Sequence, residues 1–182
     1  VEDDLEKIRS YDLDFLLRFG FGIIRGGILE AARYGVWSYH HDDLDQYRGR
    51  PPCFWELDEG DPVTGATLQR LTDRLAGGVV LKKGYFKTIA TSYAANRDKV
   101  YFGSVEWPAQ VCRDLLNGCA EYVHDRPTST DAPVYYRPKR SELLRVIFKT
   151  TWNYVQRQVS SFLFADRWTI GKVKRPISSF LE

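Results

Sequence analysis

Cysteine is scarce in this chain of 182 residues, which contains only Cys53, Cys112 and Cys119. The three cysteines form no Cys-x-x-Cys pair and their number is odd, so the sequence does not indicate a disulfide framework. Cys112 and Cys119 fall in an expected helix, where packing in a core is their favoured role. We therefore expect reduced structural thiols and a cytoplasmic protein.

The chain also lacks a strong excess of charge and a long hydrophobic run. Its formal net charge is +2, and Lys and Arg are interspersed with Asp and Glu, so charge alone indicates no nucleic-acid partner. No apolar run approaches the roughly 18 residues that a membrane-spanning helix needs, and no secretory signal pattern stands at the start. The expected protein therefore has neither a membrane nor a nucleic acid as a partner.

Glycines cluster near residue 24, but they do not form a dinucleotide-binding fingerprint. Gly20, Gly22, Gly26 and Gly27 depart from the Gly-x-Gly-x-x-Gly spacing. Tight turns that need positive φ explain this cluster better than a phosphate cradle does. A nicotinamide cofactor is therefore not expected.

The remaining composition is that of a globular protein, with 43% hydrophobic and 14% aromatic residues. This content allows one proper core and a small appended subdomain. Apolar runs and helical periodicity predict both strands and helices. Strands are expected at 12–24, 36–40, 64–71 and 78–86, and helices at 2–8, 27–33, 51–60, 91–97, 108–123 and 141–164.

The most informative segment is Ser38–Gly49, which reads SYHHDDLDQYRG and follows a short apolar run. It places His40 at the end of an expected strand, where open α/β sheets carry their chemistry. A single histidine at such a place can also be a core residue that is hydrogen-bonded to the backbone. The neighbouring residues therefore decide how this histidine is interpreted.

Ser38–Gly49 resembles the signature of the folate-dependent formyltransferases, Asn-x-His-Pro-Ser-Leu-Leu-Pro-x-Tyr-x-Gly. In that family a Thr-Gly-x-Thr segment and a Leu-Asp-x-Gly loop follow, and here they read TGAT at 64–67 and LAGG at 75–78. The resemblance covers roughly residues 13–81. It implies a partial three-layer α/β Rossmann-like sheet followed by a C-terminal helical extension.

The resemblance also implies how the chain is divided. Residues 1–90 would form the second half of the family's α/β domain, and residues 91–182 a helical extension that leads toward a further domain. The family's first βαβαβ half has no counterpart in this sequence. The expected Ser141–Phe164 helix carries an apolar stripe, which needs a partner: the body of the protein, an adjacent domain or a second copy of the chain.

The resemblance places the family's catalytic Asn, His and Asp on Ser38, His40 and Ala76. His40 would transfer protons and stabilise a tetrahedral oxyanion, and Ser38 can still donate a hydrogen bond. Ala76 can do no acid–base work, which would cost roughly 10²–10⁴-fold in rate. Asp73 and Asp43 are the nearby carboxylates that would substitute, although a role at a helix start or a turn is favoured for Asp73.

The substrate site implied by the resemblance also includes Ala76 and two further segments. The loop Asp42–Leu44 would hold the pteridine of 10-formyltetrahydrofolate, with Leu44 as an apolar contact and Asp42 and Asp43 as added charges. Residues Tyr47, Arg48 and Gly49 would frame the pocket for a small-molecule amine. No metal is expected, because adjacent residues of an extended chain point to opposite faces and too few ligands would converge.

Two arginines would add positive charge to this site. Arg48 and Arg50 would grip a phosphate or a carboxylate on the acceptor, or would instead pair with Asp45 or Glu56 at the surface. The sequence leaves both alternatives open.

Two functions follow from these residues. The first is formyl transfer from a formyl-folate to an amine, in particular that of a sugar, with an activity that is weakened or lost. The second is a non-catalytic binding or scaffold domain in a multidomain protein, which the changes at Ser38 and Ala76 favour. A formyl-folate hydrolase is less favoured, because it would need the same missing Asp to activate water.

Overall fold

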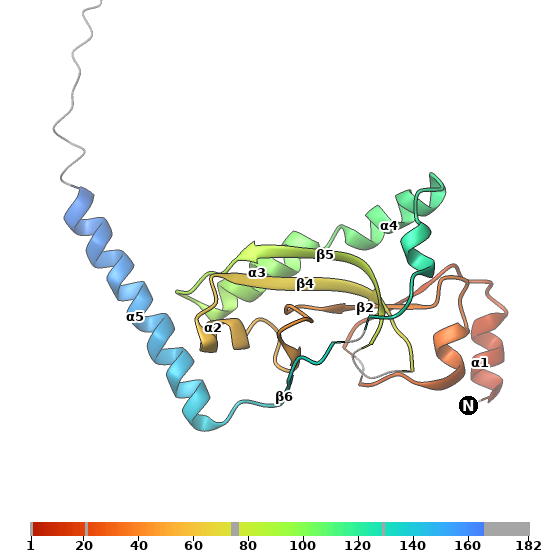
Figure 1. The fold of residues 1–182 in the computed structure, drawn as a ribbon, viewed down its shortest axis with the longest axis horizontal. Coiled ribbons are helices and arrows are strands. Elements are labelled where there is room, and N and C mark those ends of the chain that lie inside the picture. The colour runs from red at the N-terminus through yellow and green to blue at the C-terminus, as the bar shows by residue number, and fades with distance from the viewer. Residues whose placement is uncertain (1, 21, 74–76, 129, 166–182) are drawn as a thin grey trace, which may run out of the picture.

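The computed structural model describes residues 2–20, 22–73, 77–128 and 130–165. A four-stranded sheet in the order β1-β2-β4-β5 forms the centre of the fold (Figure 1). Strands β1 and β2 are parallel, and β4 is antiparallel to both of its neighbours, β2 and β5. The strands of this sheet are β1 (Leu16–Arg18), β2 (Val36–His40), β4 (Val63–Arg70) and β5 (Val79–Lys87).

The mixed sheet corrects one expectation. A long apolar strand over 12–24, typical of a parallel sheet, was predicted, but only Leu16–Arg18 is a strand and it is only half-buried. Asp12 and Gly20, with φ of 46° and 68°, turn the backbone on either side of it. The apolar residues here therefore lie in turns and in a strand at the edge of the sheet. Hydrophobicity alone does not distinguish such a segment from a central strand.

Helices and short strands surround the sheet. The expected helix at 91–97 continues to Ser104, and the one at 108–123 ends at Leu116 because Gly118 adopts a φ of 69°. The helical elements are α1 (Glu2–Arg9), η1 (Gly26–Glu30), α2 (Trp55–Glu59), α3 (Tyr93–Ser104), α4 (Trp107–Leu116), η2 (Glu121–His124) and α5 (Arg140–Ala165). Two short parallel strands, β3 (Arg48–Gly49) and β6 (Val134–Tyr135), form a separate ribbon.

The main core joins the sheet to α3 and α4. Trp37 and Leu68 from the sheet are fully buried with Val100 of α3 and Val111 of α4. Apolar side chains from the second half of the chain therefore complete the core of the first half. The division of the chain at residue 90 stays a prediction.

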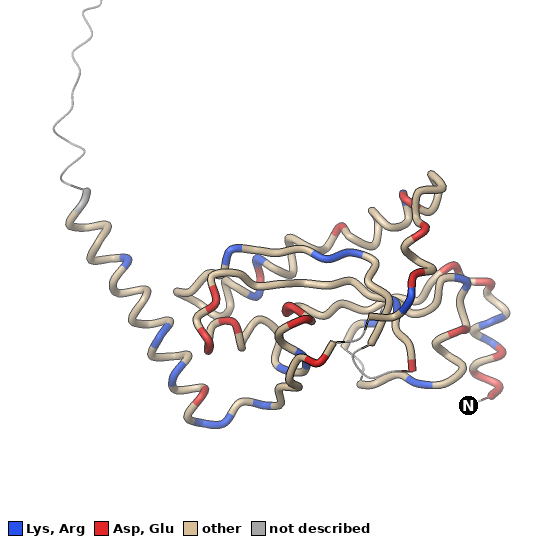
Figure 2. Tube along the Cα trace, viewed as in Figure 1, with Lys and Arg blue, Asp and Glu red and all other residues tan. Residues whose placement is uncertain are grey.

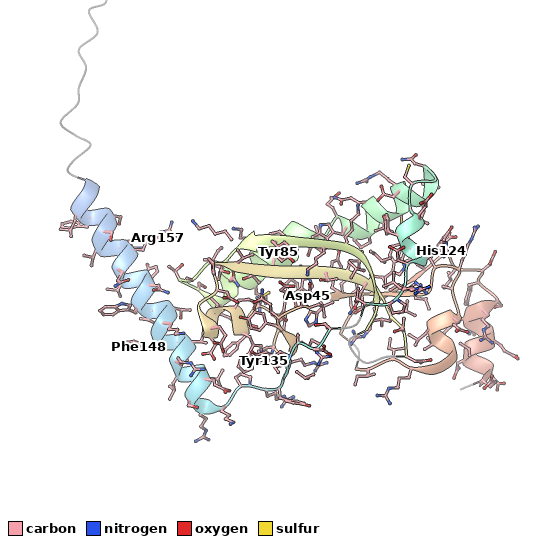
Figure 3. All side chains as sticks on the ribbon, in the orientation of Figure 1. Asp45, Tyr85, His124, Tyr135, Phe148 and Arg157 are labelled. Carbon is pink, nitrogen blue, oxygen red and sulfur yellow. The ribbon has the colours of Figure 1, made fainter. Side chains whose placement is uncertain are left out.

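Helix α5 is confirmed where the apolar stripe predicted it. Its first turns are anchored by buried Val146, by the ion pair between Arg145 and Asp58, and by Asn153, whose side chain donates to the Ala90 carbonyl at 3.1 Å. Beyond these contacts α5 leaves the packed body (Figure 1), and Phe148 lies outside it (Figure 3). In the described part of the chain no helix is long and apolar enough to cross a membrane.

Gly49 explains why the Tyr-x-Gly segment ends in glycine. Its φ is +112°, and a Cβ built on it would lie 1.8 Å from the Tyr135 carbonyl oxygen of β6. Only glycine allows β3 and β6 to approach this closely. Because these strands carry Arg48 and Tyr135, the approach also fixes one wall of the functional site.

We expect Gly49→Ala to lower the free energy of unfolding by about 1–3 kcal/mol or more. Both backbone strain and the clash of the new Cβ with the Tyr135 carbonyl oxygen contribute to this loss. Urea denaturation measures this loss. Gly60→Ala is the matched control, because Gly60 also has positive φ but a Cβ added there would meet no atom within 4 Å. An equal loss in both variants would contradict the importance of the close approach.

Candidate functional site

His40 ends β2 and lines a pocket of about 440 Å³, which we call the His40 pocket. The ends of β1, β2 and β4 form one side of this pocket, and the β3·β6 ribbon forms the other. Of the predicted site residues, His40, Leu44, Arg48, Gly49 and Asp73 line it. The full lining is Arg18, Ile23, Ile24, Arg25, Tyr39, His40, Leu44, Arg48, Gly49, Arg50, Gln69, Leu71, Asp73, Val134, Tyr135, Tyr136 and Arg137.

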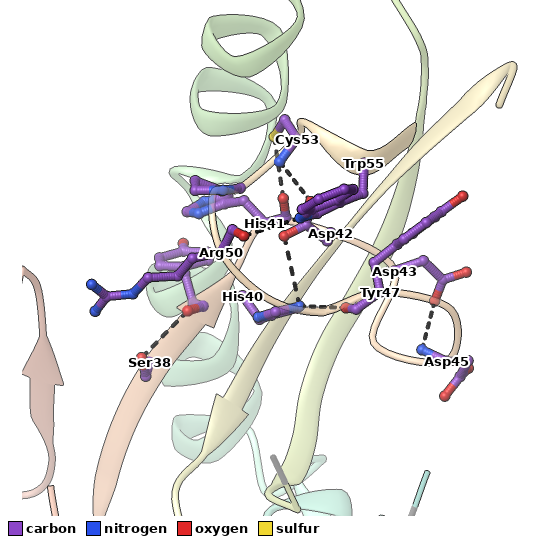
Figure 4. A network of polar contacts seen from close by, with 12 residues as sticks. Ser38, His40, His41, Asp42, Asp43, Asp45, Tyr47, Arg50, Cys53 and Trp55 are labelled. Atoms are coloured by element: carbon purple, nitrogen blue, oxygen red, sulfur yellow. Dashed lines mark hydrogen bonds and ion pairs between the residues drawn. The ribbon is translucent and has the colours of Figure 1, made fainter. Parts of the chain in front are cut away.

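The His40 ring is held by one strong hydrogen bond. Its Nε2 lies 2.8 Å from the Tyr47 carbonyl oxygen (Figure 4). A carbonyl can only accept, so Nε2 carries the proton and Nδ1 keeps the lone pair. Burial lowers the pKa of His40, so the ring is neutral near pH 7 with Nδ1 as a basic nitrogen.

Ser38 lies on the same strand and is joined to an arginine that the sequence analysis missed. The Ser38 Oγ is buried and accepts a hydrogen bond of 2.9 Å from Nη1 of Arg18, whose Nη2 donates to the Gly22 carbonyl at 2.9 Å. Burial, and then the charge of Arg50, lower the pKa of Arg18. An arginine at the end of an apolar strand was the available sequence signal.

The carboxylates of the acidic loop have separate roles, and neither Asp42 nor Asp43 lines the His40 pocket. Asp43 pairs with Lys83 at 2.8 Å, and the more exposed Asp45 pairs with the same Lys83 at 2.5 Å. Asp42 is buried and accepts a hydrogen bond of 2.6 Å from the Cys53 amide. Leu44 is therefore the residue of this loop that meets the pocket.

Asp42 lies next to a second buried carboxyl group, that of Glu56 on α2. Burial, followed by repulsion from Glu56, raises the pKa of Asp42. Burial also raises the pKa of Glu56 to about 7. Two close carboxyl groups in a dry interior cannot both ionise, so near neutral pH this pair shares a proton.

Charge distinguishes the His40 pocket from the rest of the chain, where Lys and Arg are interspersed with Asp and Glu (Figure 2). Five arginines line it but only one carboxylate, Asp73, does so. Four of these arginines form no ion pair within the described residues: Arg25, Arg48, Arg50 and Arg137. Pairing of Arg48 or Arg50 with Asp45 or Glu56, one sequence-based alternative, is therefore absent from the structure.

Asp73 and Ala76, the two predicted site residues in the loop after β4, differ in what the structure describes. Asp73 is exposed at the pocket, and its Oδ1 accepts a hydrogen bond of 3.2 Å from the Gly26 amide, as expected of a turn role. Ala76 lies outside the described residues. Among the side chains that the structure describes, no group of three or more His, Cys, Asp or Glu is arranged to hold a metal ion.

Known proteins resemble this chain in both sequence and structure, although no protein-family model matches it. The methionyl-tRNA formyltransferase of Agathobacter rectalis is 26% identical over 121 residues, 65% of this chain and 39% of that protein. That of Prochlorococcus marinus is 34% identical over 82 residues, 44% of this chain and 24% of that protein. The chain thus spans less than half the length of these relatives.

Among solved structures, a variant of HypX from Aquifex aeolicus shares the fold, with a TM-score of 0.60 at 17% identity over 78% of this chain and 24% of that one. The site is thus that of an α/β protein with a histidine at the end of a strand. In sequence the chain is similar to methionyl-tRNA formyltransferases, and it shares its fold with the HypX structure. The resemblance to formyltransferases that the Ser38–Gly49 motif indicated is confirmed.

The Glu56 carboxyl group should make stability depend on pH. Its pKa is raised from 4.5 to about 7, so the folded protein binds this proton more tightly than the unfolded chain does. The free energy of unfolding should therefore fall as the pH rises through this window, by roughly 3 kcal/mol if the whole shift is realised. Denaturation from pH 4.5 to 8 measures this fall, which Glu56→Gln should reduce.

Glu59→Gln is the matched control, because Glu59 lies exposed on the same short helix. Its pH dependence should equal that of the unmodified protein. Parallel curves for the Glu56→Gln variant and the unmodified protein would contradict the assignment.

Proposed function

We propose that the protein transfers a formyl group from 10-formyltetrahydrofolate to an amine. The observation that carries this proposal is the neutral His40, which has a basic Nδ1 and lines a pocket of substrate size at the strand end. The sequence similarity to methionyl-tRNA formyltransferases supports it. HypX, which shares the fold, has also been solved in complex with tetrahydrofolic acid, with a TM-score of 0.54.

The His40 pocket fits a folate by its chemistry. Ile24, Leu44 and Leu71 offer an apolar wall for a flat ring, and the amide of Gln69 offers both a donor and an acceptor. The arginines offer partners for the carboxylates of the folate tail. The bound folate would supply the formyl group, while residues of this chain would orient it and move protons.

His40 would act as the proton carrier. The lone pair on Nδ1 would accept the proton that the attacking amine loses, and the same nitrogen would return it to the departing folate nitrogen. The hydrogen bond from Nε2 to the Tyr47 carbonyl would keep the ring oriented during both transfers. No net proton would be gained or lost in the cycle.

Arg18, held in place by Ser38, would replace the family's asparagine as the donor. Negative charge develops on the formyl oxygen during transfer, and donors fixed in advance stabilise it. Arg18 brings a positive charge as well as N–H groups, and its bond to Ser38 holds it at the pocket wall. Ser38 would therefore act chiefly by positioning Arg18.

The acceptor amine would carry a phosphate or a carboxylate. Arg48 and Arg50 lie at the β3 wall near His40 and have no acidic partner among the described residues. Charged groups without a partner in a pocket favour an anionic ligand. An amino sugar that bears a phosphate has both the required amine and the required charge.

A non-catalytic binding domain is the second candidate function. The observation in its favour is alanine at position 76, where the family has its aspartate. In that function the exposed apolar face of α5 would dock an adjacent domain or a second copy of the chain. Both functions use the same pocket, so turnover separates them.

The test is consumption of 10-formyltetrahydrofolate in the presence of glucosamine 6-phosphate as a probe amine. We expect the unmodified protein to consume it, His40→Ala to lose at least about 10²-fold in rate, and Ala76→Asp to gain. Activity only in Ala76→Asp would identify a disarmed pocket that binds without turnover. No activity in any variant would contradict formyl transfer and favour the scaffold.

Arg50→Gln should weaken use of the charged acceptor. Loss of one charge-assisted hydrogen bond should raise the KM for glucosamine 6-phosphate by about tenfold or more, with little change for glucosamine. Steady-state kinetics with both amines measures the difference. Arg33→Gln, an exposed site outside the pocket, is the control, and equal KM changes for both amines would contradict a phosphate-binding role.

A further inference from the structure

The buried carboxyl pair of Asp42 and Glu56 lies directly behind His40 and is not used in the mechanism above. The Oδ2 of Asp42 lies 3.8 Å from Nε2 of His40, on the side of the ring that carries the proton (Figure 4). The Cys53 amide donates to the other oxygen, Oδ1, at 2.6 Å and so fixes the direction of the carboxyl group. The pair therefore faces the ring edge that does not serve the substrate.

Stability does not explain why these groups are buried. Asp42 is 2% exposed and Glu56 is fully buried, and within the described residues no Lys or Arg forms an ion pair with either. Buried carboxyl groups cost free energy, and a pair of them costs more because they repel each other. Costly clusters of titratable groups are found preferentially at functional sites.

We propose that the Asp42–Glu56 pair is the positioning acid of this site, which holds one negative charge behind His40 and stabilises its protonated ring. The inference rests on the proposed formyl transfer. When Nδ1 accepts the amine proton, the new positive charge lies beside Asp42, as in a carboxylate–histidine arrangement of a hydrolase. The family's catalytic aspartate is replaced by Ala76 in this chain. The Asp42–Glu56 pair thus supplies a negative charge in its place.

Other charged groups near His40 are already engaged. Burial lowers the pKa of His40 and the charge of Asp43 partly opposes this shift, but the Asp43 carboxylate is paired with Lys83 at 2.8 Å. His41 stacks between Tyr39 and Tyr101, and burial followed by the charge of His40 lowers its pKa to about 4, so it stays neutral. The arginines line the same pocket as His40, and positive charges there do not favour protonation of its ring.

The charge of the Asp42–Glu56 pair changes with pH near neutrality. Burial raises the pKa of Glu56 to about 7, so the pair is neutral well below this pH and carries one negative charge above it. The stabilising charge is then present only as the pH rises past this value. We expect kcat of the unmodified protein to rise with pH through this range.

The test is the pH profile of kcat and KM with 10-formyltetrahydrofolate and glucosamine 6-phosphate. In Asp42→Asn the negative charge can lie only on Glu56 and is no longer shared with the carboxyl group beside the ring, so kcat should fall about 10²-fold with KM changed less than about twofold. In Glu56→Gln the repulsion that raises the pKa of Asp42 is removed, and the negative charge can lie only on Asp42. This variant should keep most of kcat and shift the rise to lower pH.

Asp45→Asn, in the same loop but outside the pair, is the control and should leave the profile unchanged. A wild-type kcat and pH profile in Asp42→Asn would overturn the inference while the proposed function stands. An equal loss in Asp42→Asn and Glu56→Gln, without the shift of the rise, would assign the pair a structural role and also overturn it. Absence of turnover in the unmodified protein would contradict the proposed function itself, and the inference with it.

Discussion

The hydrogen bond from His40 Nε2 to the Tyr47 carbonyl is the interaction on which the site depends. It joins the end of β2 to the start of β3 across the acidic loop, so it closes that loop and orients the ring at once. Because a carbonyl accepts only from a protonated nitrogen, it also determines which nitrogen is basic. A single backbone contact therefore sets the geometry, the tautomer and the direction of proton transfer.

The two walls of the His40 pocket are positioned by different means. The wall from the main sheet follows from core packing, because Trp37 and Leu68 bury the inner faces of β2 and β4. The opposite wall follows from the close approach of Gly49 to the backbone of β6. Arginines on both walls then meet across one cavity, and their mutual repulsion makes an anionic ligand the natural complement.

The sequence predicted the features that depend on local pattern. Strand β2, the helix that ends at Gly60 and the long helix α5 follow from alternation, a left-handed terminal glycine and an apolar stripe. The histidine at the end of β2 followed from a motif with a family resemblance. These features need no knowledge of which segments meet in space.

The features that the sequence did not predict depend on tertiary contacts. Arg18 looked like an interruption of an apolar strand, and only the parallel pairing of β1 with β2 places it beside Ser38. Asp42 looked like one of several loop charges, and only the return of the chain through α2 brings Glu56 against it. Periodicity cannot show which of three neighbouring acidic residues are buried, because that depends on the elements that cover them.

The measurement that tests this account most directly is the ring nitrogen NMR spectrum of His40 as a function of pH. The chain contains only three histidines, so a His40→Ala spectrum identifies the signals. The account predicts a neutral ring at pH 7 with the proton on Nε2 and none on Nδ1. A charged ring at pH 7, or a proton on Nδ1, would contradict it.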